Sequence, residues 1–301
     1  MRLPVRAAFV ALCFPALLTL TDARQAPAAS GSQQAKDLLA AARVAMGGEA
    51  AFAALKSLEI FGNVVQTVQA GRAINVDGQI VSAIVGGRSN LSLDIKVALP
   101  DKYVRINRFA PDEGSSKYID EFRGFNGSDL IRDTSAQFGG VTDSKVMPNP
   151  KLDSTKRQYL LDAKHAFAEI LLPMLANAYD GYPLDFSVGG EEQLPSGKAT
   201  IVNAEGADGL HLKLYLDNAT HLPMLVTGLM KPMLTNLFVE FYMPEEEWRM
   251  TIADYKVSNG FKWPHKMTSK FEDDTTEEIH LDRFSINPKF GDHTFAPNTG
   301  R

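Results

Sequence analysis

Residues 90–97, NLSLDIKV, place an apolar side chain at every second position. The apolar positions are Leu91, Leu93, Ile95 and Val97. Successive side chains of a β-strand point to opposite faces, so this pattern predicts a strand with one face in a core and the other in water. Residues 209–217, GLHLKLYLD, repeat the pattern with leucine at every second position. The two stretches predict antiparallel sheet in both halves of the chain.

Several other segments are rich in β-forming residues. They predict strands at residues 58–69, 103–109, 117–125, 237–243, 249–257, 261–270 and 277–286. Asn259-Gly260 separates two of these segments and is a strong signal for a two-residue hairpin. Residues 126–157 are rich in Gly, Asp, Ser and Pro and predict a long loop.

Three segments have helical character. Helical spacing of apolar residues predicts a helix over residues 35–46 and a short second one over 49–55. Residues 157–179, RQYLLDAKHAFAEILLPMLANAY, predict one long helix that is apolar over much of its circumference, as is typical of a buried helix. Strands outnumber helices and do not alternate with them, which excludes a doubly wound α/β sheet. The predicted fold is therefore mainly β (α+β), a large curved antiparallel sheet or half-open β barrel with helices covering the concave side.

The N-terminus has the three-part pattern of an export signal. Arg2 and Arg6 precede an apolar run over residues 7–20, and small-residue cleavage sites follow. The run is shorter than the roughly 20 residues that a membrane-spanning helix needs, although an uncleaved short anchor is the alternative. We therefore predict a signal peptide over residues 1–28, a linker over 29–34, one domain over 35–301, and a mature chain without a transmembrane span. The predicted location is the bacterial periplasm.

Charge and cysteine content exclude several classes of function. The chain has a formal net charge of -5, and removal of residues 1–28 leaves 28 basic and 35 acidic side chains. An acidic chain without a basic cluster is a poor candidate for binding nucleic acid. Cys13, the single cysteine, lies inside the predicted signal, so the mature chain has no disulfide, cysteine nucleophile or cysteine-ligated zinc.

The sequence carries no recognisable catalytic constellation. Its six histidines show no HExxH spacing, and neither a GxSxG elbow nor a phosphate-binding glycine loop is present. The sequence therefore predicts no catalytic residue, no cofactor and no metal, and we do not expect an enzyme. A metal-assisted enzyme built from distant histidines is the weakest alternative.

Flexible apolar side chains are the positive signal. Residues 223–234, PMLVTGLMKPML, contain three methionines, which suit surfaces that accept variable apolar shapes. This stretch is interpreted as a loop or lid at an apolar cavity, with ordinary core packing as the alternative. The long helix offers a second such surface, and a curved sheet beneath it predicts a concave apolar pocket. The residues predicted to line that pocket are Leu91, Leu93, Phe167, Leu171, Met174, Leu212, Leu214, Met224, Met230 and Met233.

The last third of the chain resembles a known family. Residues 212–226, LKLYLDNATHLPMLV, are followed by residues 250–268, MTIADYKVSNGFKWPHKMT, and residues 279–298, IHLDRFSINPKFGDHTFAPN. This order is similar to the strand–turn–strand succession of the bacterial outer-membrane lipoprotein-sorting (carrier) proteins, which have the Lol-type fold. The matching positions are Leu214 to Asp217, Thr220, Leu222-Pro223, Asp254-Tyr255, Asn259-Gly260, Pro264, Ile286-Asn287, Phe295 and Pro297.

The resemblance implies a half-open β barrel closed by helices around a cavity for lipid chains, and it implies no catalytic residue. The chain departs from the family in its greater length and in its unusually apolar middle helix. Two functions follow as hypotheses. The first is a periplasmic carrier of lipid or lipoprotein acyl chains, with envelope proteins as further partners. The second is a non-catalytic envelope interaction module whose core is filled, and the lack of a sizeable cavity would favour it.

Overall fold

The computed structural model describes residues 28–68, 73–76, 79–83, 87–110, 116–138, 141–143, 153–230, 233–235, 240–242, 246–271 and 274–296. The predicted export signal lies outside these residues except for Ala28.

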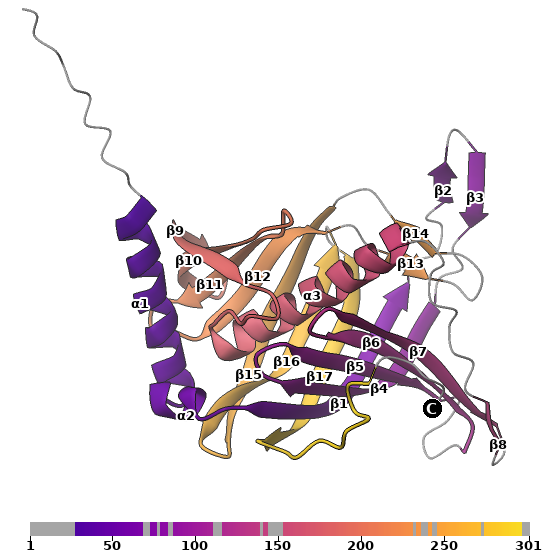
Figure 1. The fold of residues 1–301 in the computed structure, drawn as a ribbon. Helices are drawn as coiled ribbons and strands as arrows, with labels where there is room; N and C mark the ends of the chain where they lie inside the picture. Colours follow the sequence, from indigo (N-terminus) through magenta and orange to yellow (C-terminus); the bar gives the residue numbers. More distant parts are fainter. Residues whose placement is uncertain are drawn as a thin grey trace, which may run out of the picture.

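One thirteen-stranded sheet runs through the described chain (Figure 1). Its strands from the first part of the chain are β1 (Ser57–Val68), β4 (Gly87–Ala98), β5 (Lys102–Phe109), β6 (Tyr118–Asn126), β7 (Asp129–Phe138) and β8 (Val141–Asp143). The later ones are β9 (Leu184–Leu194), β10 (Gly197–Gly206), β11 (His211–Asp217), β12 (Pro223–Met230), β15 (Glu246–Ser258), β16 (Phe261–Phe271) and β17 (Asp274–Ile286). The small pairs β2 (Ala73–Val76) with β3 (Gln79–Ala83), and β13 (Met233–Thr235) with β14 (Glu240–Tyr242), stand apart.

The sheet has the order β8-β7-β6-β5-β4-β1-β17-β16-β15-β12-β11-β10-β9, and its paired strands are antiparallel. The pairing of β1 with β17 joins a meander from each half of the chain. Its edges are two different strands, β8 and β9, so the sheet is open, as predicted. Asn259 and Gly260 connect β15 to β16 with φ angles of 53° and 82°, the left-handed pair that a two-residue hairpin of the predicted kind requires.

Helices cover the sheet at one end and across one face. Helix α1 (Ala28–Met46) contacts β9 and β16, and the short α2 (Glu49–Ala53) follows it. Helix α3 (Asp153–Leu175) crosses the sheet and contacts β6 and β7 as well as β11 and β12 (Figure 1). One helix thus bridges the two meanders. We call the face that α3 covers the inner face.

The alternation that predicted the sheet is confirmed by burial. On β4, Leu91, Leu93, Ile95 and Val97 are 0–2% exposed. On β11, Leu212 and Leu214 are equally buried, and all of these residues join one hydrophobic core with the apolar side of α3. The core therefore fills the inner face, and it extends under α1 and α2.

The outer face carries two smaller apolar clusters. Ala199, Ile201, Tyr215 and Leu225 form one of them. The other consists of Val104, Ile131 and Phe295, where the C-terminal segment crosses the strands of the first meander. These clusters bury parts of the face that alternation assigned to water.

Two segments differ from the sequence-based expectation. Residues 29–34, expected as a linker, belong to α1, where they extend the alanine-rich helix that follows without an intervening proline. The expected long loop over residues 126–157 contains β7, β8 and the first turn of α3. The two-residue turn Gly127-Ser128 lets β7 pair with β6, so strand pairing overrides a polar composition there.

Candidate functional site

The structure places most of the predicted pocket residues in packed core. Seven of them are 0–2% exposed and belong to the same cluster, namely Leu91, Leu93, Phe167, Leu171, Met174, Leu212 and Leu214. The sheet and α3 therefore meet directly along these side chains. An acyl chain that used this surface would have to take the place of α3 side chains.

The methionine-rich stretch is not a loop or a lid over its described part. Residues 223–230 form β12, which pairs with β11 and β15 inside the sheet. Met224 sits at an irregularity in the pairing with β11 and packs on the outer-face cluster around Ile201, away from the other predicted pocket residues. Pairing on both sides explains why this apolar stretch is a strand. The side chains of Met230 and Met233 lie outside the described part of the chain.

Burial divides α3 into two halves. None of the side chains from Asp153 to Asp162 is buried. All six from Ile170 to Leu175 are buried, as are Phe167 and Ala168. The C-terminal half is therefore part of the core, whereas the N-terminal half lies on it as a partly solvated cover.

Aromatic packing and a cap hold the C-terminal half. The Phe167 ring meets the rings of Tyr103 and Phe125 edge-on, with centroid distances of 5.7 and 5.3 Å. Arg43 on α1 donates from Nη1 to the carbonyl oxygen of Ala176 at 2.6 Å, directly after the end of α3. A cation at a helix C-terminus satisfies a free carbonyl and complements the helix dipole. This end of α3 is thus fixed to both the sheet and α1.

A polar contact holds the middle of α3. Nε2 of His165 lies 3.1 Å from the hydroxyl of Tyr182, which is itself buried. Burial lowers the pKa of His165, because the charged imidazolium loses solvation there. The neutral ring is therefore the form that fits this contact.

The N-terminal half of α3 contacts the sheet through a cation–π pair. The Arg132 guanidinium lies 4.1 Å from the centre of the Tyr159 ring. One turn further, Lys164 Nζ lies 5.6 Å from the centre of the Phe125 ring. Contacts of this kind contribute about 0.5–1 kcal/mol at exposed sites. The N-terminal half thus rests on the sheet through partly exposed contacts, whereas the half that ends at Leu175 is built into the core.

Three arginines line up across neighbouring strands beneath this cover. Arg105 on β5 pairs in register with Arg123 on β6, which pairs with Arg132 on β7. All three lie on the inner face, because each stands two residues along its strand from Tyr103, Phe125 or Leu130. Tyr103 and Phe125 belong to the core, and Leu130 pairs directly with Phe125. We call Arg105, Arg123 and Arg132 the arginine row. Like charges directly opposite on adjacent strands destabilise a sheet, so the row needs neighbouring anions.

Carboxylates and amides surround the row. Arg105 donates from Nε to Asn107 at 3.1 Å and from Nη2 to Glu277 at 3.4 Å. Glu277 also accepts from Gln66 at 2.9 Å. Arg123 donates from Nε and Nη2 to one oxygen of Glu121, at 2.9 and 2.5 Å.

Water reaches this part of the inner face, unlike the packed core. The side chains of Arg105, Glu277 and Arg123 are 17%, 24% and 35% exposed. With Asn107 and Glu121 they form a polar patch that interrupts the apolar inner face. The patch and the neighbouring core together make an amphipathic surface.

Two titratable groups beside the patch are strongly affected by burial. Burial raises the pKa of Glu169 on α3 to about 8, with smaller contributions from the charges of Asp162 and Glu277. Burial also raises the pKa of Tyr103 to about 12, and its hydroxyl is buried without a hydrogen-bond partner among the described residues. At neutral pH both groups are therefore mainly uncharged. The phenol of Tyr103 is thus a buried donor that the described contacts leave unused.

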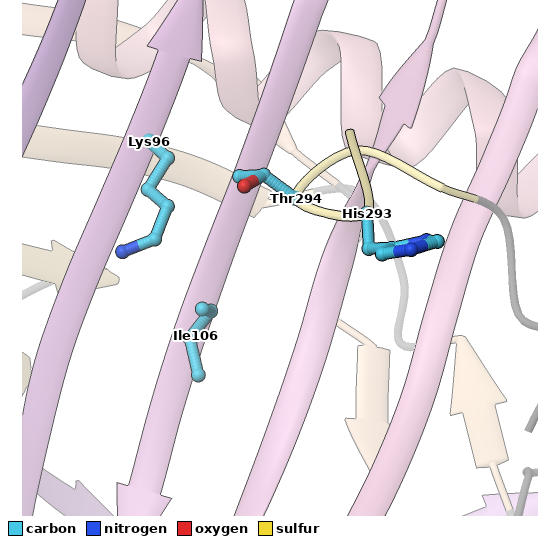
Figure 2. Close-up of a pocket in the computed structure, with 4 residues that line it drawn as sticks. All are labelled: Lys96, Ile106, His293 and Thr294. Carbon is cyan, nitrogen blue, oxygen red and sulfur yellow. The ribbon is translucent and has the colours of Figure 1, made fainter. Parts of the chain in front are cut away.

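The outer face carries a shallow open depression of about 270 Å³. Figure 2 shows Lys96 and Ile106 on neighbouring strands, with His293 and Thr294 in the C-terminal segment that crosses them. Lys96 forms ion pairs there with Glu59, at 2.7 Å, and with Asp94. The depression is small, and its cation is already paired, so it is a weaker candidate than the inner face.

Residues that carry the family resemblance serve turns and junctions. Asn287 accepts from the backbone N–H of Lys56 at 2.7 Å and donates to the carbonyl of Ala54 at 3.0 Å, and so fixes the junction between α2 and β1. Asp217 accepts from the backbone N–H groups of Ala219 and Thr220 in the β11–β12 turn. The resemblance therefore rests on residues that shape the sheet and lie outside the polar patch.

The described residues hold neither a metal-binding cluster nor a membrane-crossing helix. These residues include no group of three or more His, Cys, Asp and Glu side chains that could hold a metal ion. Within the same ranges, no helix combines the length and the apolar character needed to cross a membrane.

Sequence reasoning missed the arginine row. Residues 103–109 and 117–125 were predicted as strands, but their faces were not assigned, and β7 was expected to be loop. Alternation from Tyr103 places Arg105 on the same face as that aromatic residue. An arginine in phase with buried aromatic residues was therefore the available signal for Arg105, and it recurs for Arg123, which is in phase with Phe125.

Comparisons with known proteins give structural likenesses only. No protein-family model matches the chain. No curated protein matches it by sequence. A DUF1329 family protein from Desulfovibrio piger is similar with 10% identity and a TM-score of 0.46, over 88% of this chain and 97% of that one. A putative outer membrane lipoprotein-sorting protein domain from Vibrio parahaemolyticus has 12% identity and a TM-score of 0.43, over 89% and 97%. A LolA superfamily protein from Nitrosomonas europaea has 9% identity and a TM-score of 0.45, over 87% and 97%.

Proposed function

We propose that this chain is a carrier or receptor for lipid or lipoprotein acyl chains, which bind on the inner face of the open sheet where α3 now lies. The export pattern of residues 1–28 supports a periplasmic location for this function. The resemblance of the last third of the sequence to lipoprotein-sorting carriers supports the same class of cargo.

The observation that carries the proposal is the contrast along α3. Its N-terminal half covers the inner face without one buried side chain, while the face beneath continues into the apolar core. Displacing this segment costs less than displacing the buried half, because only the partly buried Leu160 and Leu161 lose packing against the core. Each acyl methylene that replaces it contributes about 0.8 kcal/mol of burial. A long chain therefore gains more than the cover loses.

The alternative is an envelope interaction module with a filled core. The 0–2% exposure of the seven described pocket residues favours it. The two functions differ in one measurable respect, since the carrier must admit an acyl chain into the interior whereas the module must exclude it.

The two tryptophans provide the test, because both belong to the inner core. Trp248 and Trp263 are 5% and 0% exposed, and the sequence contains no other tryptophan. Trp248 lies near the polar patch. It is two residues from Met250 on β15, and Met250 pairs with Ser269 on β16. Ser269 in turn pairs with Glu277 of the patch. Trp263 lies at the far end, with its ring centroid 6.3 Å from that of Phe52 on α2.

The experiment is fluorescence quenching by a fatty acid brominated along its chain, with the unbrominated acid as control. Trp263→Phe leaves Trp248 as the sole reporter, and Trp248→Phe leaves Trp263. We expect saturable quenching of Trp248 and weaker quenching of Trp263. Absence of quenching at both tryptophans, with the protein folded, would reject the carrier and favour the interaction module.

A further inference from the structure

We infer that the lipid bound by this chain has an anionic head group, and that the arginine row binds that group while the acyl chain packs on the neighbouring apolar inner face. The inference rests on the proposed function and specifies its ligand. The chemistry is that of a carboxylate or phosphate attached to an acyl chain.

The first support is the register of the row. Arg105, Arg123 and Arg132 occupy directly paired positions on β5, β6 and β7. Neighbouring strands lie about 4.7–4.9 Å apart, so three guanidinium groups start from adjacent points on one face. Guanidinium groups match carboxylate and phosphate oxygens in pairs, and a row of them offers donors along one line.

The second support is donor capacity at the deepest member. A guanidinium has five N–H donors. Arg105 uses Nε on Asn107 and Nη2 on Glu277, the latter at the long distance of 3.4 Å. No hydrogen bond from its Nη1 is present among the described residues. Burial opposes the charge of Arg105, and Glu277 is the main group that favours it. An additional anion would bind a largely buried cation whose one carboxylate partner, Glu277, lies at the long distance of 3.4 Å.

The third support is a buried donor beside the row. Tyr103 lies two residues before Arg105 on the same face and is 1% exposed. Its hydroxyl has no hydrogen-bond partner among the described residues, although burial without one is costly. A head-group oxygen near Arg105 would give this hydroxyl an acceptor.

The nearby carboxyl groups leave room for a further negative charge. Glu121 is paired with Arg123, and Glu277 is shared between Gln66 and Arg105. Glu169 is mainly protonated at neutral pH, since its pKa is about 8, and it adds little repulsion.

The position of the patch fits an amphipathic ligand. The patch lies beneath the N-terminal half of α3, as the contact between Arg132 and Tyr159 shows, and this half is the weakly held one. The packed core begins at the neighbouring positions Tyr103 and Phe125. A head group on the row therefore directs its acyl chain along α3 toward the core.

The test compares a brominated fatty acid with its methyl ester, which has the same chain without the charge. Affinities are measured by quenching in the wild type, Arg105→Gln, Arg123→Gln and Arg108→Gln. Arg108 is the matched control, because it lies on β5 on the outer face, 46% exposed and paired with Asp120. In the wild type and Arg108→Gln, we expect the acid to bind at least about tenfold more tightly than the ester.

In Arg105→Gln and Arg123→Gln, we expect the preference for the acid to fall below about threefold, with ester affinity unchanged within about twofold. Retained ester binding shows that a variant is folded. Should Arg105→Gln fail to fold, the more exposed Arg123→Gln decides. Equal binding of acid and ester by the wild type overturns the anionic head group but leaves the lipid carrier standing. Failure of both probes rejects the proposed function itself.

Inorganic phosphate distinguishes a free anion from a lipid head group. We expect phosphate alone at millimolar concentration neither to raise the Tm of the wild type above that of Arg123→Gln nor to displace the brominated acid. A phosphate-dependent rise in Tm that Arg123→Gln abolishes, together with displacement of the acid, would assign the row to a free anion and overturn the inference.

Discussion

The two halves of α3 have the same secondary structure and opposite relations to the sheet. From Ile170 to Leu175 all side chains are buried, and Arg43 caps the end through the carbonyl of Ala176. From Asp153 to Asp162 none is buried, and the contacts include a cation–π pair between Tyr159 and Arg132. The difference corresponds to what lies beneath, which is apolar core in one case and the polar patch in the other.

This contrast indicates where the molecule can open without unfolding. Removing the buried half exposes the apolar core of both meanders, at a cost comparable to global stability. Lifting the N-terminal half exposes no fully buried side chain, although Leu160 and Leu161 lose their partly buried packing on the core. Segments with few buried apolar contacts are the ones that open locally at low free energy. The following predictions test the contrast, beginning with the largest expected effect.

Phe167→Ala is expected to lower the free energy of unfolding by about 3–5 kcal/mol. The side chain is 1% exposed and meets Tyr103 and Phe125, so its removal leaves a cavity between α3 and the sheet. Urea denaturation followed by tryptophan fluorescence measures the change. A loss below about 1 kcal/mol would mean that the C-terminal half is not part of the core and that the two halves do not differ.

The alternation of apolar and polar residues was enough to predict antiparallel strands with one buried face. Leu91 to Val97 and Leu210 to Leu216 have a period of two, and one buried face is the only arrangement that satisfies it. The hairpin at Asn259-Gly260 follows from the left-handed φ angles that these two residues tolerate. These signals depend only on residues close together in the sequence, so a single sequence is enough to detect them.

The site could not be predicted because it depends on pairing between distant segments. The arginine row exists only through the register of β5, β6 and β7, and β7 lies in a stretch whose polar composition indicated a loop. Met224 shows the same limit, because an irregularity between β11 and β12 places it on the outer-face cluster. Which residues become neighbours is a property of register, and the composition of one strand does not contain it.

Glu169→Gln is expected to change how stability depends on pH. The pKa of this carboxyl rises from 4.5 to about 8 on folding, so between these values the folded state binds the proton more tightly than the unfolded state. Wild-type stability should therefore fall as pH rises through this range, whereas the glutamine variant lacks this loss.

Because the side chain is only half-buried, we expect the variant to be more stable than the wild type by ~2–4 kcal/mol at pH 9. At pH 4 the two should be nearly equal, since glutamine resembles the protonated acid. Urea denaturation at both pH values measures the difference. Equal stabilities at pH 9 would show that the carboxyl is ionised at no cost and is well solvated.

Arg43→Met tests the cap at the fixed end of α3. The substitution keeps an unbranched side chain on α1 but removes the donor to the carbonyl of Ala176 and the 2.8 Å ion pair with Glu49. Ala176 has a left-handed φ of 45°, a conformation that a non-glycine residue holds only with support from its surroundings. We expect a loss of about 1–2 kcal/mol in urea denaturation, with Lys36→Met on the exposed side of α1 as the neutral control. A loss no larger than that of Lys36→Met would show that the Arg43 hydrogen bond does not stabilise this end of α3.

Tyr159→Ala should have the smallest effect on stability and the most local one. The ring lies on the Arg132 guanidinium from a half-buried position, and loss of this cation–π contact is expected to cost about 0.5–1 kcal/mol. Hydrogen exchange measured by mass spectrometry should be faster across Asp153 to Asp162 and unchanged across Ile170 to Leu175, because only the weakly held half loses a contact. Faster exchange across both halves would mean that α3 opens as one unit. The inner face would then be reached only by displacing the whole helix, and the low cost assigned to lipid access would no longer hold.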